Sequence, residues 1–358
     1  MTGPAAPCAG VPGGPLLARW LGLAVLACAG LAAAAEQPSP AVIAPLAPRS
    51  LLLDVCALPG GGLVAVGERG HVLTSGDAGA SWTQRPAPAR SNLTAVTFVD
   101  AQHGWAVGHD ELILRTSDGG QSWQLSHYAP ERQQPLLGVS FADPLHGIAI
   151  GAFSTVYTTA DGGQSWQAAD FRPAPPPSAR SPAARAGRKP DAMRDDDEGV
   201  NQPHLNAIAR AADGALYLAA EAGHLYRSAD GGAHWNELAS PYNGSFFGLL
   251  PLERDALLVF GLRGHLYRSE DAGRSWRALD SHTLALLAGG TRLADGTIVI
   301  VGLAGTVLVS GDGGQSFALR QQADRKGFAA VAPAGDGIVV VGESGARRLS
   351  RAELGGGG

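Results

Sequence analysis

The chain has 358 residues, of which 45% are hydrophobic and 16% are charged, and it contains 50 glycines and 24 prolines. There is enough apolar material for a buried core, and the many turn-forming residues favour short strands. The formal net charge of -5 provides no broad basic field for a phosphate backbone, so we expect no nucleic-acid partner.

The first 35 residues have the pattern of a signal peptide. Arg19 precedes an apolar run over residues 20–35, which is too short and too rich in alanine to span a bilayer. Ala33 and Ala35 fit the small-residue rule for cleavage. We therefore expect an exported protein whose mature chain begins at Glu36.

Cleavage at this point would leave Cys56 as the one cysteine of the mature chain, because it removes Cys8 and Cys28. Cys56 lies in a strand-like run, and we expect it to be a small core residue without a disulfide. The alternative is a lipid anchor on Cys28, although Leu26 fits poorly in the sequence before it.

One eight-residue motif occurs six times, with aspartate third, glycine fifth and an aromatic residue last. The copies span residues 75–82, 116–123, 159–166, 228–235, 269–276 and 310–317. Their aspartates and aromatic residues are Asp77, Asp118, Asp161, Asp230, Asp271, Asp312, Trp82, Trp123, Trp166, Trp235, Trp276 and Phe317. Successive aspartates lie 41 to 43 residues apart, except for one interval of 69, and this is the length of a four-stranded propeller blade.

Within one repeat, residues 93–99, 105–108, 112–116 and 122–125 favour four short strands, and the motif joins the third to the fourth. We expect each aspartate to accept hydrogen bonds from the amides of its own turn. Each aromatic residue should pack between blades. The alternative is that the aspartates are catalytic or bind calcium, but their repetition in every blade favours the structural role.

A seventh unit over residues 327–349 lacks the motif and provides only three strands. An open sheet edge promotes aggregation, so we expect residues 41–47 to supply the missing outer strand. The sequence thus predicts an all-β fold over residues 36–350. It is a seven-bladed β-propeller of four-stranded antiparallel blades, closed by an N-terminal strand and followed by a disordered tail at 351–358.

The loops between the second and third strands share one face of the predicted disc. Glycines flank two variable positions in most of these loops, which is typical of a scaffold that presents side chains to a partner. The alternative is that these are ordinary solvated turn residues. The partner-binding candidates are Glu68, Arg69, His109, Asp110, Phe153, Glu221, Arg263 and Glu343.

The long interval contains an insertion over residues 171–200, between the third and fourth blades. It is rich in proline, with basic residues between Arg172 and Lys189 and an acidic run at 195–198. This composition favours a flexible segment that either folds onto a partner or serves as a linker.

The repeated eight-residue motif has the pattern of an Asp-box. Asp-boxes also occur in sialidases, so a glycoside hydrolase or a sugar-binding propeller is the alternative function. The arginines Arg115, Arg227 and Arg268 share one register of the third strand. The tyrosines Tyr157, Tyr226 and Tyr267 share the preceding position, and the histidines His71, His224 and His265 share the position just after the loop glycine. Repeat architecture explains these sets without an active site or a metal centre. We expect no catalytic residues, no metal and no cofactor.

The segments FVDAQHGWAVG at 98–108, RTSDGGQSW at 115–123 and FADPLHGIAIG at 141–151 resemble the photosystem II stability and assembly factor family. The resemblance covers residues 51–349. It implies a seven-bladed propeller that attaches to membrane protein subunits during assembly. Family members use basic surface residues in the thylakoid lumen, and this chain lacks a strong basic patch.

From the repeats and the resemblance together we expect a non-catalytic exported binding scaffold that assists the assembly or stability of a membrane protein complex. That complex would be a photosystem or an envelope transporter. The expected partners are membrane protein subunits, and the scaffold alone should be a monomer. The expected location is the periplasm, or the thylakoid lumen in a photosynthetic source.

Overall fold

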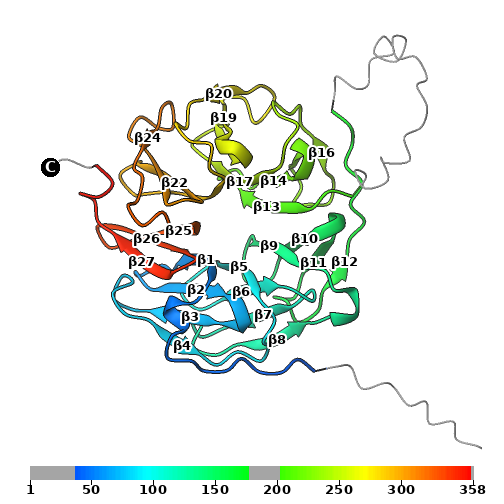
Figure 1. The fold of residues 1–358 in the computed structure, drawn as a ribbon. Coiled ribbons are helices and arrows are strands. Elements are labelled where there is room, and N and C mark those ends of the chain that lie inside the picture. The colour runs from blue at the N-terminus through cyan, green and yellow to red at the C-terminus, as the bar shows by residue number, and fades with distance from the viewer. Residues whose placement is uncertain (1–36, 177–201, 356–358) are drawn as a thin grey trace, which may run out of the picture. The chain divides into compact units, whose positions relative to one another are not determined.

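The computed structural model describes residues 37–176 and 202–355, and within them the chain forms six four-stranded sheets and one three-stranded sheet. All pairings inside the sheets are antiparallel between strands adjacent in the chain. The sheets follow one another around a ring (Figure 1). The predicted seven-bladed propeller is confirmed. The expected signal peptide, Cys28 and most of the 171–200 insertion lie outside the described residues.

Each blade begins at the centre of the ring and ends at its rim. The innermost strands are β1 (Leu52–Ala57), β5 (Leu93–Phe98), β9 (Leu136–Phe141), β13 (Leu205–Arg210), β17 (Phe246–Pro251), β21 (Leu287–Arg292) and β25 (Phe328–Ala334). The second strands are β2 (Leu63–Gly67), β6 (Gly104–Gly108), β10 (Gly147–Gly151), β14 (Leu216–Ala220), β18 (Leu257–Gly261), β22 (Ile298–Gly302) and β26 (Gly337–Gly342).

The third strands are β3 (Val72–Ser75), β7 (Ile113–Thr116), β11 (Val156–Thr159), β15 (Leu225–Ser228), β19 (Leu266–Ser269), β23 (Thr306–Ser310) and β27 (Gly345–Leu349). The outer strands are β4 (Thr83–Arg85), β8 (Gln124–His127), β12 (Gln167–Ala168), β16 (Asn236–Glu237), β20 (Arg277–Leu279) and β24 (Ala318–Leu319). Short 3-10 turns are η1 (Ala47–Arg49), η2 (Glu68–Gly70), η3 (Pro130–Arg132), η4 (Ala152–Ser154), η8 (Glu221–Gly223) and η9 (Leu262–Gly264). In the described ranges, none of the helices has the length and apolar character needed to cross a membrane.

The core of the propeller lies between blades. Second strands such as β2, β18 and β22 are buried along their whole length, because a neighbouring blade covers each face of the sheet. Their continuous apolar sequences follow from this burial on both faces. Cys56 of β1 also packs in an inter-blade cluster, where burial raises the pKa of its thiol to about 12.

The last residue of each Asp-box packs in the cluster shared with the preceding blade. Trp123 of the second blade contacts the cluster of Val64 and Val66 from the first. Trp82 of the first blade packs against the cluster that contains Val339 of the seventh. The same arrangement holds for Trp166, Trp235, Trp276 and Phe317. These aromatic residues therefore hold neighbouring blades together.

The ring closes differently from the sequence expectation. Residues 41–47 form no outer strand for the seventh blade, whose sheet consists of β25, β26 and β27 alone. The arm over residues 37–46 instead runs beside the first blade, where Ala41 N–H donates to the Ala87 carbonyl. Pro45 and Pro48 lack the N–H groups that a ladder requires.

Closure comes from the innermost strands, because β1 packs directly against β25 (Figure 1). Ala47 of η1 is fully buried in the cluster between the first and seventh blades. The close approach of η1 to the start of β27 explains Gly345, whose φ is +80° and where a Cβ would lie 1.9 Å from the Pro48 carbonyl oxygen.

Two segments expected to be flexible are ordered in their described parts. In the tail, Leu354 is buried in the cluster between the sixth and seventh blades, and Glu353 accepts a hydrogen bond from Ser350 N–H. At the start of the insertion, Phe171 packs against Tyr226 and Trp235, and Ala174 pairs with Asn236 at the rim of the fourth blade. In both cases one apolar side chain fixes a segment whose overall composition is that of a loop.

Candidate functional site

Each Asp-box is a closed set of hydrogen bonds within eight residues. In the first box, Asp77 Oδ1 accepts hydrogen bonds from Ser75 Oγ at 2.8 Å and from Ser81 N at 2.9 Å, and Asp77 Oδ2 accepts one from Ser81 Oγ at 2.6 Å. Ser75 Oγ also accepts one from Gly79 N at 2.8 Å. The first-position hydroxyl is therefore as central to the turn as the aspartate, a role that the sequence reasoning missed.

The other boxes repeat this geometry, and in the fourth His234 replaces the serine, with its Nδ1 2.7 Å from Asp230 Oδ2. Hydrogen bonds from Ser81 lower the pKa of Asp77 to about 2. Because the acids lie in six separate turns around the ring, the structure does not gather them into one site. Among the described residues no group of three or more metal-ligating side chains is assembled.

The tyrosines at the shared register are buried in different clusters, with exposed fractions of 5%, 2% and 9% for Tyr157, Tyr226 and Tyr267. Burial raises the pKa of all three, and that of Tyr157 to about 12. A phenolate nucleophile is therefore disfavoured at each position.

Glu111 is fully buried between the second and third blades, where it takes the place of a loop glycine with a φ of 49°. Its carboxylate accepts a hydrogen bond from the Tyr157 hydroxyl at 2.6 Å and lies 3.4 Å from Arg132 Nη1. The hydrogen bond from Tyr157, the charge of Arg132 and the His127 ring, whose Nε2 lies 3.7 Å from the carboxylate, keep the pKa of Glu111 below its ordinary value despite its burial. This network joins the two blades.

The loops between second and third strands form tight turns on the face opposite the Asp-boxes. In six of the described turns the second central residue is left-handed although it is not glycine. These residues are Arg69, Asp110, Phe153, Ala222, Arg263 and Ala304. Their side chains are displayed by a fixed backbone, which suits a surface that presents residues to a partner.

Several of the predicted partner-binding residues make contacts within the protein itself. Asp110 accepts a hydrogen bond from Ser91 Oγ at 2.6 Å. Glu221 accepts one from His204 N at 3.1 Å, and the Phe153 ring stacks edge-on against the His204 ring at 4.8 Å. His109 and Arg263 are exposed. None of these five residues lines the hollow to which the other three candidates belong.

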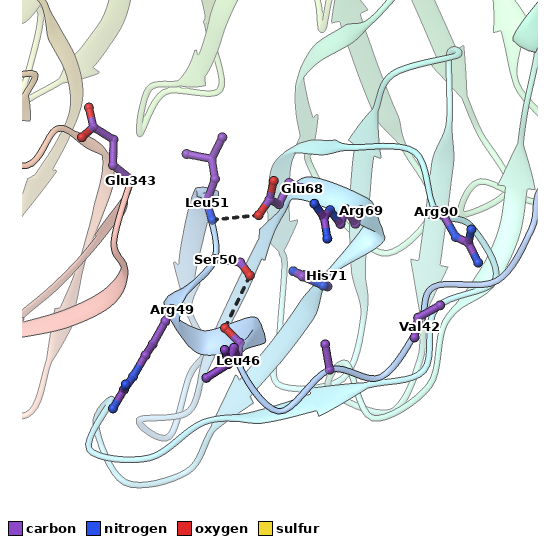
Figure 2. Close-up of a pocket in the computed structure, with 11 residues that line it drawn as sticks. Val42, Leu46, Arg49, Ser50, Leu51, Glu68, Arg69, His71, Arg90 and Glu343 are labelled. Atoms are coloured by element: carbon purple, nitrogen blue, oxygen red, sulfur yellow. Dashed lines mark hydrogen bonds between the residues drawn. The ribbon is translucent and has the colours of Figure 1, made fainter.

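Glu68, Arg69 and Glu343 do come together, in a hollow of about 930 Å³ between the first and seventh blades (Figure 2). The N-terminal arm forms one wall of this hollow with Val42 and Leu46. The remaining lining includes Arg49, Ser50, Leu51, His71 and Arg90. We call it the arm hollow.

The arm hollow combines exposed apolar side chains with unpaired positive charge. Val42 is 59% exposed and Leu46 is 65% exposed. Arg49, Arg69 and Arg90 form no side-chain hydrogen bond or ion pair within the described part of the chain, and the lining thus contains three arginines and two glutamates. Of the two glutamates, Glu68 accepts a hydrogen bond from Leu51 N–H at 3.3 Å.

His71 closes the floor of the arm hollow. Its side chain is 3% exposed, and Nδ1 has no hydrogen-bond partner. Burial lowers the pKa of His71, so the ring is neutral at pH 7. The sequence reasoning missed Arg49, Arg90 and the arm, and the one available signal was Pro45, which lacks a ladder N–H in the middle of residues 41–47.

Residues 79–134 match the family model described as photosynthesis system II assembly factor YCF48. The photosystem II stability/assembly factor HCF136 of Cyanidioschyzon merolae is 41% identical over 61 residues, which cover 16% of this chain and 14% of that protein. The HCF136 protein of Oryza sativa is 30% identical over 117 residues, 29% of this chain and 28% of its own length.

A solved structure of YCF48 bound to D1 peptide superimposes with a TM-score of 0.64 at 18% identity, covering 88% of this chain and 99% of that one. The resemblance to the photosystem II assembly factor family is confirmed. The sequence matches to the curated relatives span less than a third of those proteins, whereas the propeller fold matches YCF48 over almost its whole length.

Proposed function

We propose that this protein is an exported, non-catalytic binding scaffold that assists the assembly or stability of a membrane protein complex. The relatives that share its repeats bear the names of photosystem II assembly factors, and one YCF48 structure holds a D1 peptide. The apolar run and the small-residue pattern before Glu36 support export, to the periplasm or, in a photosynthetic source, to the thylakoid lumen.

The arm hollow carries this proposal. In this proposal the arm hollow binds an extended segment of a membrane protein subunit. Apolar side chains of the segment would contact Val42 and Leu46. A carboxylate of the same segment would pair with the arginines, which are suited to bidentate recognition of carboxylates. At about 930 Å³ the hollow takes several residues of such a segment.

The test is capture of membrane subunits from native membranes by the purified full chain, with crosslinking and mass spectrometry. Reversing the charge of Arg49, Arg69 and Arg90 to glutamate should reduce the captured subunit at least tenfold, since charge-assisted hydrogen bonds to a buried partner are worth about 1.5–3 kcal/mol each. The substitutions break no described side-chain interaction, so the fold should be retained.

Arg274→Glu is the matched control, because Arg274 is exposed in an Asp-box turn on the other face. Capture by this variant should equal that of the wild type. The proposal is wrong if the triple variant captures the same membrane subunit as efficiently as the control does, or if the wild-type protein captures no membrane subunit.

A further inference from the structure

Three arginines occupy one register, directly before the Asp-box, and two of them have partners. Arg227 Nε donates to the Tyr217 hydroxyl at 3.0 Å, and its guanidinium lies 5.8 Å from the centre of the Tyr217 ring. Arg268 Nε donates to Glu270 at 2.7 Å, and Nη1 donates to the Gly313 carbonyl of the next blade at 2.6 Å. In both blades the arginine is part of the folded framework.

Arg115, the third member, has lost each of these partners. Its cross-strand neighbour is Trp105, which has no hydroxyl group. Trp105 Nε1 also donates to the Gly162 carbonyl at 3.0 Å, the position that corresponds to the carbonyl bound by Arg268. Ser117 stands where the fifth blade has Glu270.

As a result Arg115 is half-buried and makes no hydrogen bond or ion pair with any residue that the structure describes. A half-buried guanidinium without a protein partner is free to bind an anion through charge-assisted hydrogen bonds. Arg115 therefore differs from Arg227 and Arg268, which are both held by partners in the fold.

Arg115 lines a hollow of about 270 Å³ between the second and third blades, on the Asp-box face. Ser117, Gln124 and Gln164 also line it, and Leu145, which is 52% exposed, stands at its rim. The one carboxylate in the lining, Asp161, has its oxygens occupied by Thr159 and Ser165. It does not neutralise the guanidinium by a direct contact.

The side chains that line this hollow indicate the chemical class of its ligand. A guanidinium binds a carboxylate through two parallel hydrogen bonds, and side-chain amides and hydroxyls bind sugar hydroxyls. A volume of about 270 Å³ is at the lower limit for small-molecule sites and takes a single sugar ring. We infer that this hollow binds a small hydroxylated carboxylate of the sugar-acid class, independently of the arm hollow on the opposite face.

Isothermal titration with D-glucuronate, D-glucose and acetate tests the inference on the full chain. The wild type should bind glucuronate at least tenfold more tightly than either glucose or acetate, because only glucuronate uses both the guanidinium and the hydroxyl partners. Arg115→Gln should weaken glucuronate binding at least tenfold without lowering the thermal unfolding midpoint, since no described contact is lost.

Arg227→Gln is the matched control from the same register. It should bind glucuronate as the wild type does but unfold at a lower temperature, because it loses the contact with Tyr217. The inference is overturned if the wild type binds none of the three ligands at tens of millimolar, if glucose or acetate binds as tightly as glucuronate, or if Arg115→Gln binds glucuronate unchanged. None of these results bears on the capture of membrane subunits.

Discussion

At the scale of single residues, the chain uses carboxylates mainly as turn acceptors. Each Asp-box acid receives hydrogen bonds that favour its charged form, so its pKa in the folded state lies below the value of an unfolded aspartate. Asp54 behaves in the opposite way. It is half-buried on the innermost strand of the first blade, where its carboxylate accepts a hydrogen bond from Val96 N–H at 2.8 Å, and burial raises its pKa to about 6.

These shifts predict a stability that falls in acid. The unfolded state binds protons to the box aspartates near pH 4, while the folded state binds them only near pH 2 for Asp77 and Asp271. Urea unfolding should therefore show a free energy that decreases as the pH drops from 4.5 to 2.5. Asp54 has the opposite effect, because its pKa is raised in the folded state. Its contribution to the free energy of unfolding is complete below about pH 4 and declines as the pH rises to about 6.

Asp54→Asn separates the two effects. This variant should lose the decline between pH 4 and 6 and should retain the decrease in acid. A wild-type free energy of unfolding that is constant or rises between pH 4.5 and 2.5 would contradict the role assigned to the box aspartates.

At the scale of elements, the tight turns between second and third strands fix the loop face. Gly70 has a φ of +70°, and a Cβ there would lie 2.0 Å from the Ala89 carbonyl oxygen of the segment leading to the second blade. The glycine therefore permits both the left-handed turn and the close contact between loops. Such contacts keep the turns rigid, which reduces the entropy lost when a partner binds.

Gly70→Ala should lower the free energy of unfolding by about 2 kcal/mol or more, because a left-handed alanine is strained and its methyl group meets backbone. Gly76→Ala is the control, since nothing lies within 4 Å of the Cβ and its φ is not left-handed. Chemical denaturation of both variants provides the measurement, and equal stabilities would refute this account of the turn.

At the scale of the whole molecule, the ring has two faces with different chemistry. The loop face carries the arm hollow where the first and last blades meet, and the Asp-box face carries the smaller hollow around Arg115. The N-terminal arm lies at this junction, where Ala44 packs on the core between these blades while Val42 and Leu46 remain exposed.

Removal of residues 37–46 tests whether the arm is needed to close the ring. The variant loses the Ala41–Ala87 hydrogen bond, the two contacts of the Gln84 amide with the arm, and the hydrogen bonds from η1 to the Ala44 and Leu46 carbonyls. We expect a loss of about 1–3 kcal/mol in stability, with an unchanged circular dichroism spectrum, because β1 still packs on β25. Unfolding or aggregation of this variant would show that the arm closes the ring after all.

The sequence alone determined the blade, its length, its strand order and the Asp-box turn. These features depend on residues within about forty positions of one another, and six copies of the same pattern made the assignment secure. The number of blades followed from counting the copies and adding the unit that lacks the box.

Only the tertiary structure decided which side chains meet. The arm hollow joins Val42 and Arg90 to Glu343, and Arg115 is unpaired because Trp105 takes the Gly162 carbonyl of the neighbouring blade. Closure by β1 and β25 rather than by residues 41–47 likewise depends on contacts between the two ends of the propeller. Local patterns specify hydrogen bonds within a turn, whereas these contacts depend on how blades distant in the chain pack, and no local pattern encodes that.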